Sequence, residues 1–125
     1  MTGDSLRERL RGDAPYYFGW CGLPGPLHAE AMARLPFEGV CLDMQHGLVG
    51  FADVAVMCPV VARLKKTPIV RVLWNEPALI GQALDAGAQI VISPMINTPA
   101  HAKAMVQGGK YVPQGGRSWG AYAAS

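Results

Sequence analysis

The chain lacks a hydrophobic run long enough to cross a membrane, an even set of cysteines and a stripe of basic residues. Its 125 residues are 50% hydrophobic but only 16% charged, and the net charge is +2. A membrane helix needs about 18 consecutive apolar residues. Nucleic-acid binding needs clustered basic residues, whereas Lys65–Lys66 is the only adjacent pair. The polar segment 1–13 argues against a secretory signal. We therefore expect one globular domain in the cytoplasm, with neither nucleic acid nor membrane as a partner.

The three cysteines, Cys21, Cys41 and Cys58, have no metal-ligand spacing. Cys41 lies in an apolar run and Cys58 precedes a proline. We expect three buried, reduced thiols. A catalytic thiol is the other interpretation, although no neighbour in the sequence supports it.

Short apolar runs alternate with helical patterns along the chain. Helices are predicted over 5–11, 27–35, 51–64, 76–86 and 98–106, strands over 16–20, 39–43, 67–72 and 90–92, and a loop over 108–125. Pro59 should kink or split the third of these helices. Continuous apolar strands alternating with helices are typical of a parallel sheet with right-handed crossovers. No G-x-G-x-x-G follows the first strand, which argues against a dinucleotide-binding sheet.

Polar side chains gather where the predicted strands end, which is the edge where parallel α/β proteins bind ligands. They are Asp43, Gln45 and His46 after the second strand, Arg71, Asn75 and Glu76 at and after the third, and Ser93 and Asn97 after the fourth. An Asp three residues before a His on a strand exit can orient the imidazole and raise its basicity. Gly47 allows the backbone to turn away. The other interpretation is a helix-capping Asp beside a surface His.

Arg71 lies between two valines in a short apolar strand. A charged residue there needs an anionic partner. A bound substrate carboxylate and an internal carboxylate would both suit its bidentate geometry.

The sequence context of the other polar residues indicates a function less clearly. The glycines of Gly115–Gly120 could form an anion-binding nest, or the segment could be a flexible loop. His28 and His101 are predicted to be surface residues on helices. Glu76 and Asp85 are most simply explained as helix residues.

Five blocks, in order, resemble the HpcH/HpaI aldolases, a family of metal-dependent class II pyruvate aldolases that includes 2-dehydro-3-deoxyglucarate aldolase and 4-hydroxy-2-oxoheptanedioate aldolase. The blocks are Leu42–Gly47 (LDMQHG), Thr67–Pro77, Ala83–Ala88, Pro94–Thr98 and Tyr111–Gly120. They span nearly the whole chain but only the N-terminal half of the family's length.

The resemblance implies the N-terminal half of a TIM barrel, with about four βα units preceded by a short helix, so that 1–125 is a partial aldolase domain. It also implies cleavage of a 4-hydroxy-2-oxo acid to pyruvate and an aldehyde, in the catabolism of aromatic compounds or sugar acids. His46 would be the acid/base, acting through a metal-bound water, and Asp43 would orient it. Arg71 would hold the pyruvate oxygen, with Trp20 and Ser93 also at the substrate.

The family's cofactor is a divalent metal, Mg²⁺, Mn²⁺ or Co²⁺. Its Glu and Asp ligands would lie after Ser125, so no ligand is assigned in this chain. We expect the isolated chain to be inactive as a monomer and to form a homo-oligomer or pair with a completing chain. Half a barrel has two open sheet edges, and we expect it to expose strand side chains, namely Val40, Leu42, Val70, Val72, Val91 and Ile92.

Three further points accompany the resemblance. Pro59 departs from the family, whose helix continues smoothly there. A half-barrel assembly module without metal chemistry is the second functional hypothesis. A related lyase acting on acyl-CoA thioesters is the third, although the DMQHG block favours free acids.

Overall fold

Four parallel strands form a single sheet, and their order across the sheet, β1-β2-β3-β4, is also their order in the chain. The computed structural model describes residues 3–120. The strands are β1 (Phe18–Cys21), β2 (Gly39–Asp43), β3 (Thr67–Arg71) and β4 (Ile90–Ile92). The helices are α1 (Gly3–Arg11), α2 (Pro26–Ala33), α3 (Phe51–Arg63), α4 (Pro77–Asp85) and α5 (Pro99–Gly109).

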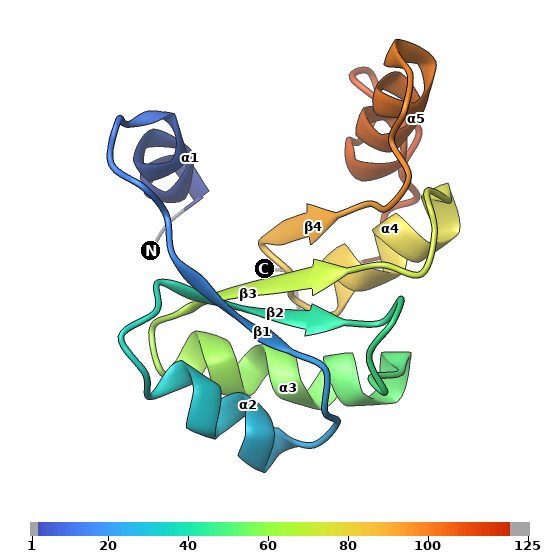
Figure 1. Ribbon diagram of the computed structural model, residues 1–125. Coiled ribbons are helices and arrows are strands. Elements are labelled where there is room, and N and C mark those ends of the chain that lie inside the picture. The colour runs from blue at the N-terminus through green and yellow to red at the C-terminus, as the bar shows by residue number, and fades with distance from the viewer. Residues whose placement is uncertain (1–2, 121–125) are drawn as a thin grey trace.

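A helix follows each strand, and α1 precedes the first (Figure 1). Parallel strands joined consecutively through helices are the arrangement of successive βα units in a TIM barrel. The predicted α/β class and the four units are confirmed.

The main core lies between one face of the sheet and the helices. α2 and α3 cover that face in Figure 1. Val40, Leu42, Val70 and Val72 point into this core and are at most 1% exposed. The expectation that these four side chains would be exposed is wrong, because the crossover helices of a parallel sheet cover the face on which they lie. Val91 and Ile92 of the edge strand β4 are only half-buried.

The opposite face of the sheet carries the residues that alternate with this core. Parallel pairing aligns Asp43 of β2 with Arg71 of β3, and Arg71 with Ile92 of β4. Trp20 of β1 lies opposite Cys41, two residues before Asp43. The register therefore brings Trp20, Asp43 and Arg71 to one face, at the carboxyl edge of the sheet.

The main departures from the predicted elements are in β1, α3 and α5. β1 begins two residues late and ends at Cys21, because its pairing with β2 runs from Phe18 opposite Gly39 to Cys21 opposite Leu42. Pro59 does not split α3, which is one helix; the proline lies on its exposed side, where water can satisfy the carbonyl left without a partner. α5 continues through Gly108, whose missing side chain allows close approach to Pro77 of α4.

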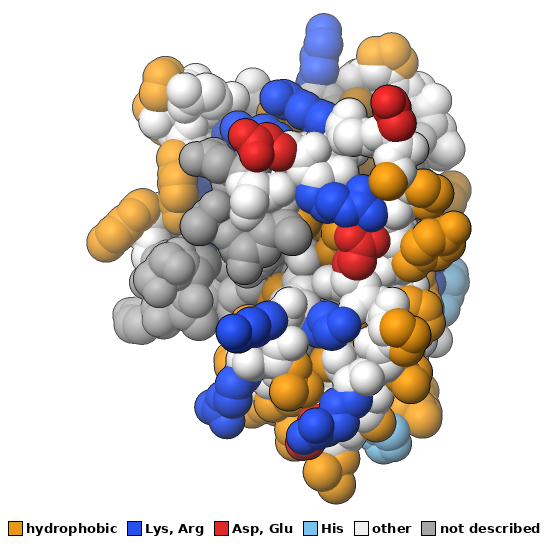
Figure 2. Space-filling model, turned by 90° about the vertical axis from the view of Figure 1, so that its left-hand side faces the viewer, with side chains coloured by type: hydrophobic (Ala, Val, Ile, Leu, Met, Phe, Trp, Pro, Cys, Tyr) orange, Lys and Arg blue, Asp and Glu red, His pale blue; other side chains and the backbone are white. Residues whose placement is uncertain are grey.

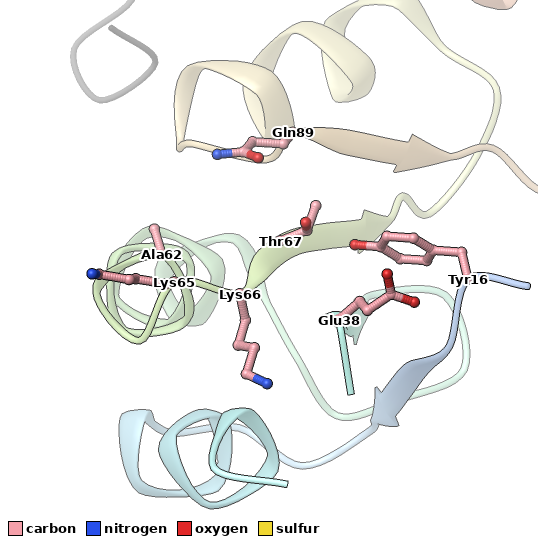
Figure 3. Close-up of a pocket in the computed structure, with 7 residues that line it drawn as sticks. All are labelled: Tyr16, Glu38, Ala62, Lys65, Lys66, Thr67 and Gln89. Atoms are coloured by element: carbon pink, nitrogen blue, oxygen red, sulfur yellow. The ribbon is translucent and has the colours of Figure 1, made fainter. Parts of the chain in front are cut away.

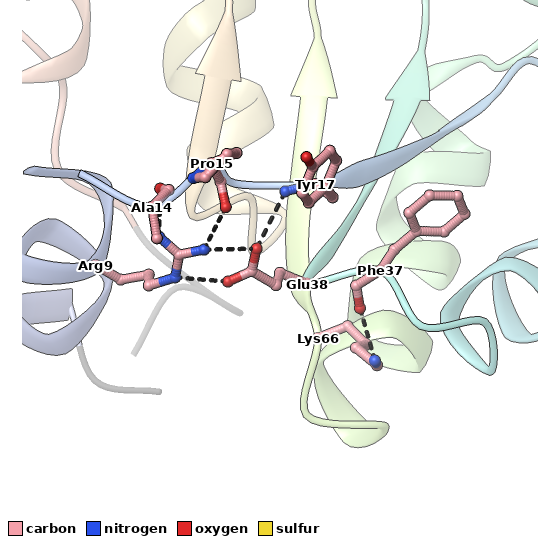
Figure 4. Close-up of polar contacts among 7 residues, drawn as sticks. All are labelled: Arg9, Ala14, Pro15, Tyr17, Phe37, Glu38 and Lys66. Carbon is pink, nitrogen blue, oxygen red and sulfur yellow. Dashed lines mark hydrogen bonds and ion pairs between the residues drawn. The ribbon is translucent and has the colours of Figure 1, made fainter. Parts of the chain in front are cut away.

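The amino edge of the sheet is rich in charge. Figure 2 views the molecule from this side, where Lys, Arg, Asp and Glu side chains gather. Arg9 of α1 donates from Nε to Glu38 Oε1 at 2.7 Å, and Lys66 Nζ donates to the carbonyl oxygen of Phe37 at 2.6 Å (Figure 4). A small cavity of about 60 Å³ lies beside them (Figure 3), lined by Tyr16, Glu38, Ala62, Lys65, Lys66, Thr67 and Gln89. The Arg9–Glu38 ion pair holds α1 against the end of the sheet opposite to Asp43.

No helix in the described part of the chain combines the length and the apolar character needed to span a membrane.

The sheet–helix core predicts a contrast between two leucines. Leu42→Ala should lower the free energy of unfolding by about 2–5 kcal/mol, because Leu42 is 0% exposed and its truncation leaves a cavity. The same change at Leu27, which is 77% exposed, should alter it by less than about 0.5 kcal/mol. Urea unfolding measures both, and equal losses would contradict this assignment of the core.

Candidate active site

The carboxylate of Asp43 lies at the centre of the polar residues on the carboxyl edge. Arg71 holds it in a bidentate pair, with Nε donating to Oδ1 at 2.8 Å and Nη2 donating to Oδ2 at 2.6 Å. Trp20 Nε1 donates to Oδ2 at 3.1 Å. The backbone N–H groups of Gln45 and His46 donate to Oδ1 at 3.0 and 3.3 Å. The hydrogen bonds from Arg71, outweighing the effect of burial, keep the pKa of Asp43 well below its usual range.

Arg71 is fixed on two sides. Besides the pair with Asp43, its guanidinium lies over the Trp20 ring, 4.8 Å from the ring centroid. The hydrogen bond to Asp43 raises the pKa of Arg71, which stays charged. The internal-carboxylate interpretation of Arg71 is therefore confirmed. Within residues 3–120, no hydrogen bond occupies Nη1, so this nitrogen can still donate to a ligand.

His46 lies in the loop after β2, and its side chain is exposed. Asp43 accepts a hydrogen bond from the backbone N–H of His46, not from its imidazole, and the ring makes no hydrogen bond within the described part of the chain. Asp43 thus orders the loop that carries His46. Gly47 contributes to the same turn, since a Cβ there would meet the Asp43 carbonyl and would lie 2.9 Å from Gly22 Cα.

Ser93 occupies the exit of β4, where its hydroxyl donates to Asn75 Oδ1 at 3.1 Å. Asn75 Nδ2 donates in turn to the carbonyl oxygen of His101 at 3.1 Å, and His101 Nδ1 accepts from the N–H of Asn97. The structure therefore joins the loops after β3 and β4. It also gives His101 a role in holding the start of α5, beyond that of the surface residue expected from its position on a helix.

The segment Gly115–Gly120 does not form the anion nest that its glycines suggested. The N–H groups of Gly115, Gly116 and Arg117 donate to the carbonyl oxygens of Tyr111, Gln107 and Lys110. These three N–H groups already donate to backbone carbonyls at and just after the end of α5, so they cannot converge on an anion. Arg117 Nη2 donates to Asp85 at 2.6 Å, and its guanidinium lies 4.5 Å from the Tyr111 ring centroid. Asp85 is therefore an ion-pair partner as well as a helix residue.

The three cysteines are buried and form no disulfide. Burial raises the pKa values of Cys41 and Cys58 to about 12, which keeps both thiols protonated. These two thiols are therefore poor nucleophiles.

The described residues do not fit a metal centre. Among residues 3–120, no three His, Cys, Asp or Glu side chains lie close enough to hold an ion together. Both oxygens of Asp43 already accept hydrogen bonds. A metal bound near Arg71 would need its ligands from outside the described residues.

Sequence reasoning identified Asp43, His46 and Arg71 but missed the hydrogen bond from Trp20 to Asp43 and the link from Asn75 to Ser93. The Trp20 contact depends on the register of β1 against β2, which leaves no signal in either segment alone. The Asn75 contact joins two loops that are 18 positions apart in the chain.

The Asp43–Arg71 pair predicts a large, pH-dependent loss of stability in Asp43→Asn. The change leaves Arg71 without its buried counter-charge and should cost about 3–5 kcal/mol at pH 7. The folded pKa of Asp43 lies below its unfolded value of about 3.9. The pair therefore stabilises the fold above about pH 4, and this stabilisation declines as the pH falls further, so the difference between wild type and Asp43→Asn should shrink in acid.

Glu30→Gln is the matched control, because it breaks the exposed Glu30–Arg34 pair on α2. It should cost less than about 1 kcal/mol. Thermal unfolding from pH 7 to pH 3 measures both variants. A pH-independent loss in Asp43→Asn would show that its charge is not what stabilises the site.

Comparison with known proteins gives one consistent result. The family model for HpcH/HpaI aldolase/citrate lyase matches residues 18–124. The chain is 44% identical over 106 residues to the hydroxypyruvate/pyruvate aldolase of Rhizorhabdus wittichii, a match that covers 85% of this chain and 42% of that protein. It is 30% identical over 117 residues to the 4-hydroxy-2-oxo-heptane-1,7-dioate aldolase of Klebsiella pneumoniae, covering 94% of this chain and 44% of that one.

A solved HpcH/HpaI aldolase/citrate lyase family protein from Burkholderia cenocepacia superposes with a TM-score of 0.88 at 36% identity, over 96% of this chain and 50% of that one. The chain thus spans about half the length of the curated relatives it matches. The family model covers most of the chain, and the structure of the chain superposes on a solved member of the family. This chain therefore belongs to the HpcH/HpaI aldolase/citrate lyase family.

Proposed function

We propose that the chain supplies the oxyanion-binding residue and the proton-transfer residue of an aldolase that cleaves a 4-hydroxy-2-oxo acid to pyruvate and an aldehyde. The observation that carries the proposal is the guanidinium of Arg71. Asp43 and Trp20 hold it at the carboxyl edge, and no hydrogen bond from residues 3–120 occupies its Nη1. A preorganised cation of this kind stabilises developing negative charge without reorganising during the reaction.

The reaction balances without an oxidant or reductant. A base takes the proton of the C4 hydroxyl, the C3–C4 bond breaks, and C4 leaves as the aldehyde carbonyl. The electron pair of the broken bond forms an enolate, whose oxygen on C2 accepts a hydrogen bond from Arg71 Nη1. Protonation of C3 then gives pyruvate. His46 is the proposed acid/base, because its side chain is exposed and its backbone N–H donates to the carboxylate that pairs with Arg71.

Asp43 is a positioning residue in this proposal. Its carboxylate orients Arg71 directly and orders the backbone at His46, so a single group fixes the cation and the loop that carries the acid/base. The Trp20 ring packs against the Arg71 guanidinium that lies over it, and the Ser93–Asn75 hydrogen bond joins the loops after β3 and β4.

We also propose that the activity depends on a divalent metal, Mg²⁺, Mn²⁺ or Co²⁺. The metal would polarise the keto acid when bound. Because the described residues do not fit it, we assign it no ligand in this chain. Assembly as an oligomer and a location in the cytoplasm belong to the same proposal.

Arg71→Ala should lower kcat/KM for pyruvate formation in the intact protein by about 10²–10³-fold, the scale for losing one oxyanion donor. Arg117→Ala is the matched control, because Arg117 also pairs with an aspartate and lies over an aromatic ring. It should leave kcat/KM nearly unchanged in the fraction of protein that remains folded. A coupled pyruvate assay with thermal unfolding of each variant measures this, and equal losses would contradict the role of Arg71.

His46→Ala should abolish the exchange of pyruvate methyl protons with solvent deuterium, since no other residue is assigned to move that proton. His28→Ala should retain it, because His28 Nδ1 lies 2.7 Å from the Pro24 carbonyl oxygen and serves the loop before α2. Proton NMR of pyruvate in D₂O follows the exchange without any aldehyde present. No exchange in the wild-type protein would favour the non-catalytic half-barrel hypothesis instead.

A further inference from the structure

Large apolar side chains are exposed along the carboxyl edge, with at least one in each of the four loops that follow the strands. We name them the apolar rim: Leu23, Leu48, Leu73, Trp74 and Met95. Leu48 is 74% exposed and Met95 is 56% exposed. Single exposed apolar residues are ordinary, but several on one edge that also carries a candidate site mark a binding surface.

Hydrogen bonds join these four loops into one continuous border. The N–H of Leu48 donates to the Gly22 carbonyl oxygen at 2.8 Å, which places the loops after β1 and β2 side by side. The N–H of Met44 donates to the Arg71 carbonyl oxygen at 3.0 Å, which links the loop after β2 to β3. Asn75 and Ser93 connect the loops after β3 and β4. The apolar rim therefore borders the edge that carries Arg71 and His46.

This border contains almost no charge. The loops 22–25, 44–50, 72–76 and 93–98 hold no Lys or Arg, and Glu76 is their one acidic residue. Arg71 is the cation at the strand ends, and Asp43 already occupies two of its nitrogens. The charged side chains Arg9, Glu38 and Lys66 belong to the opposite, amino edge (Figure 4). A second carboxylate on a substrate would therefore meet apolar side chains without a counter-charge from these loops.

Met95 has an unusual backbone conformation. Its φ is +58°, a left-handed backbone conformation that a large side chain rarely adopts. Glycine would fit there without strain, yet the chain places a flexible apolar side chain at the exit of β4. Strained residues of this kind cluster at functional sites, and a thioether adapts readily to apolar groups of different shape.

We infer that the apolar rim selects the second substrate: the aldehyde that this enzyme forms or consumes carries an uncharged, apolar substituent. The inference rests on the proposed aldolase function and deepens it, because Arg71 binds the pyruvate oxygen and His46 moves protons at the reacting carbons, whereas the rim contacts the substituent of the aldehyde. An acidic aldehyde is disfavoured, since its carboxylate would lose water without gaining a partner.

The test compares two aldehydes of similar shape, 4-methylpentanal and 4-oxobutanoate, in condensation with saturating pyruvate, using the intact protein with its metal. The wild-type protein should prefer 4-methylpentanal by at least about tenfold in kcat/KM, the scale of one apolar contact. Leu48→Arg and Leu73→Arg each add a cation to the rim and should shift the preference towards 4-oxobutanoate by a similar factor. Val56→Arg, at an exposed position on α3, should leave the preference unchanged.

The outcomes separate the two proposals. Deuterium exchange into pyruvate by the wild-type protein, together with a preference for 4-oxobutanoate, would overturn the inference and leave the aldolase proposal standing. An unchanged aldehyde preference in both rim variants would also overturn the inference, provided that thermal unfolding shows both variants to be folded. That result would indicate that another surface covers the rim. Absence of exchange in the wild type would overturn the aldolase proposal, and the inference would fail with it.

Discussion

The fold of the carboxyl edge depends on one buried carboxylate, that of Asp43. A buried charge is costly unless every oxygen finds a donor, and here the donors come from three places: Trp20 on β1, Arg71 on β3 and the backbone of the loop after β2. The strands must therefore keep their register for the charge to be satisfied. The same requirement brings the cation and the His46 loop to one edge of the sheet.

This arrangement gives the two faces and the two edges of the sheet different chemistry. One face is a core of mainly aliphatic side chains under the helices, and among the described residues this cluster contains no Asp, Glu, His, Lys or Arg. The other face bears the Asp43–Arg71 pair, in which Nη1 of the guanidinium has no hydrogen bond to any residue of 3–120. Charged side chains gather at the amino edge (Figure 2), whereas the loops of the carboxyl edge expose the five side chains of the apolar rim. This difference in polarity is the basis of the proposal that the substrate has one anionic end and one apolar end.

Membership of the HpcH/HpaI family explains why the four βα units superpose so well on half of a solved relative. It also limits what these residues supply by themselves. They contain a rigid cation and an exposed imidazole, but the described side chains offer no cluster of metal ligands. Under the proposed function, this part would bind and protonate the keto acid, and the carboxylate ligands of the metal would come from outside the described residues.

Local sequence alone determined the order of the elements, and it placed β2 and β4 to the residue, because apolar runs and the turn residues around them act over a few positions. It also identified Asp43, His46 and Arg71 as the residues to examine. Only the tertiary structure decided which face of each strand is buried, which anion pairs with Arg71 and which carbonyl oxygens accept from the N–H groups of Gly115–Arg117. Those outcomes depend on register and packing between segments far apart in the chain, and no local pattern encodes the partner that folding brings alongside.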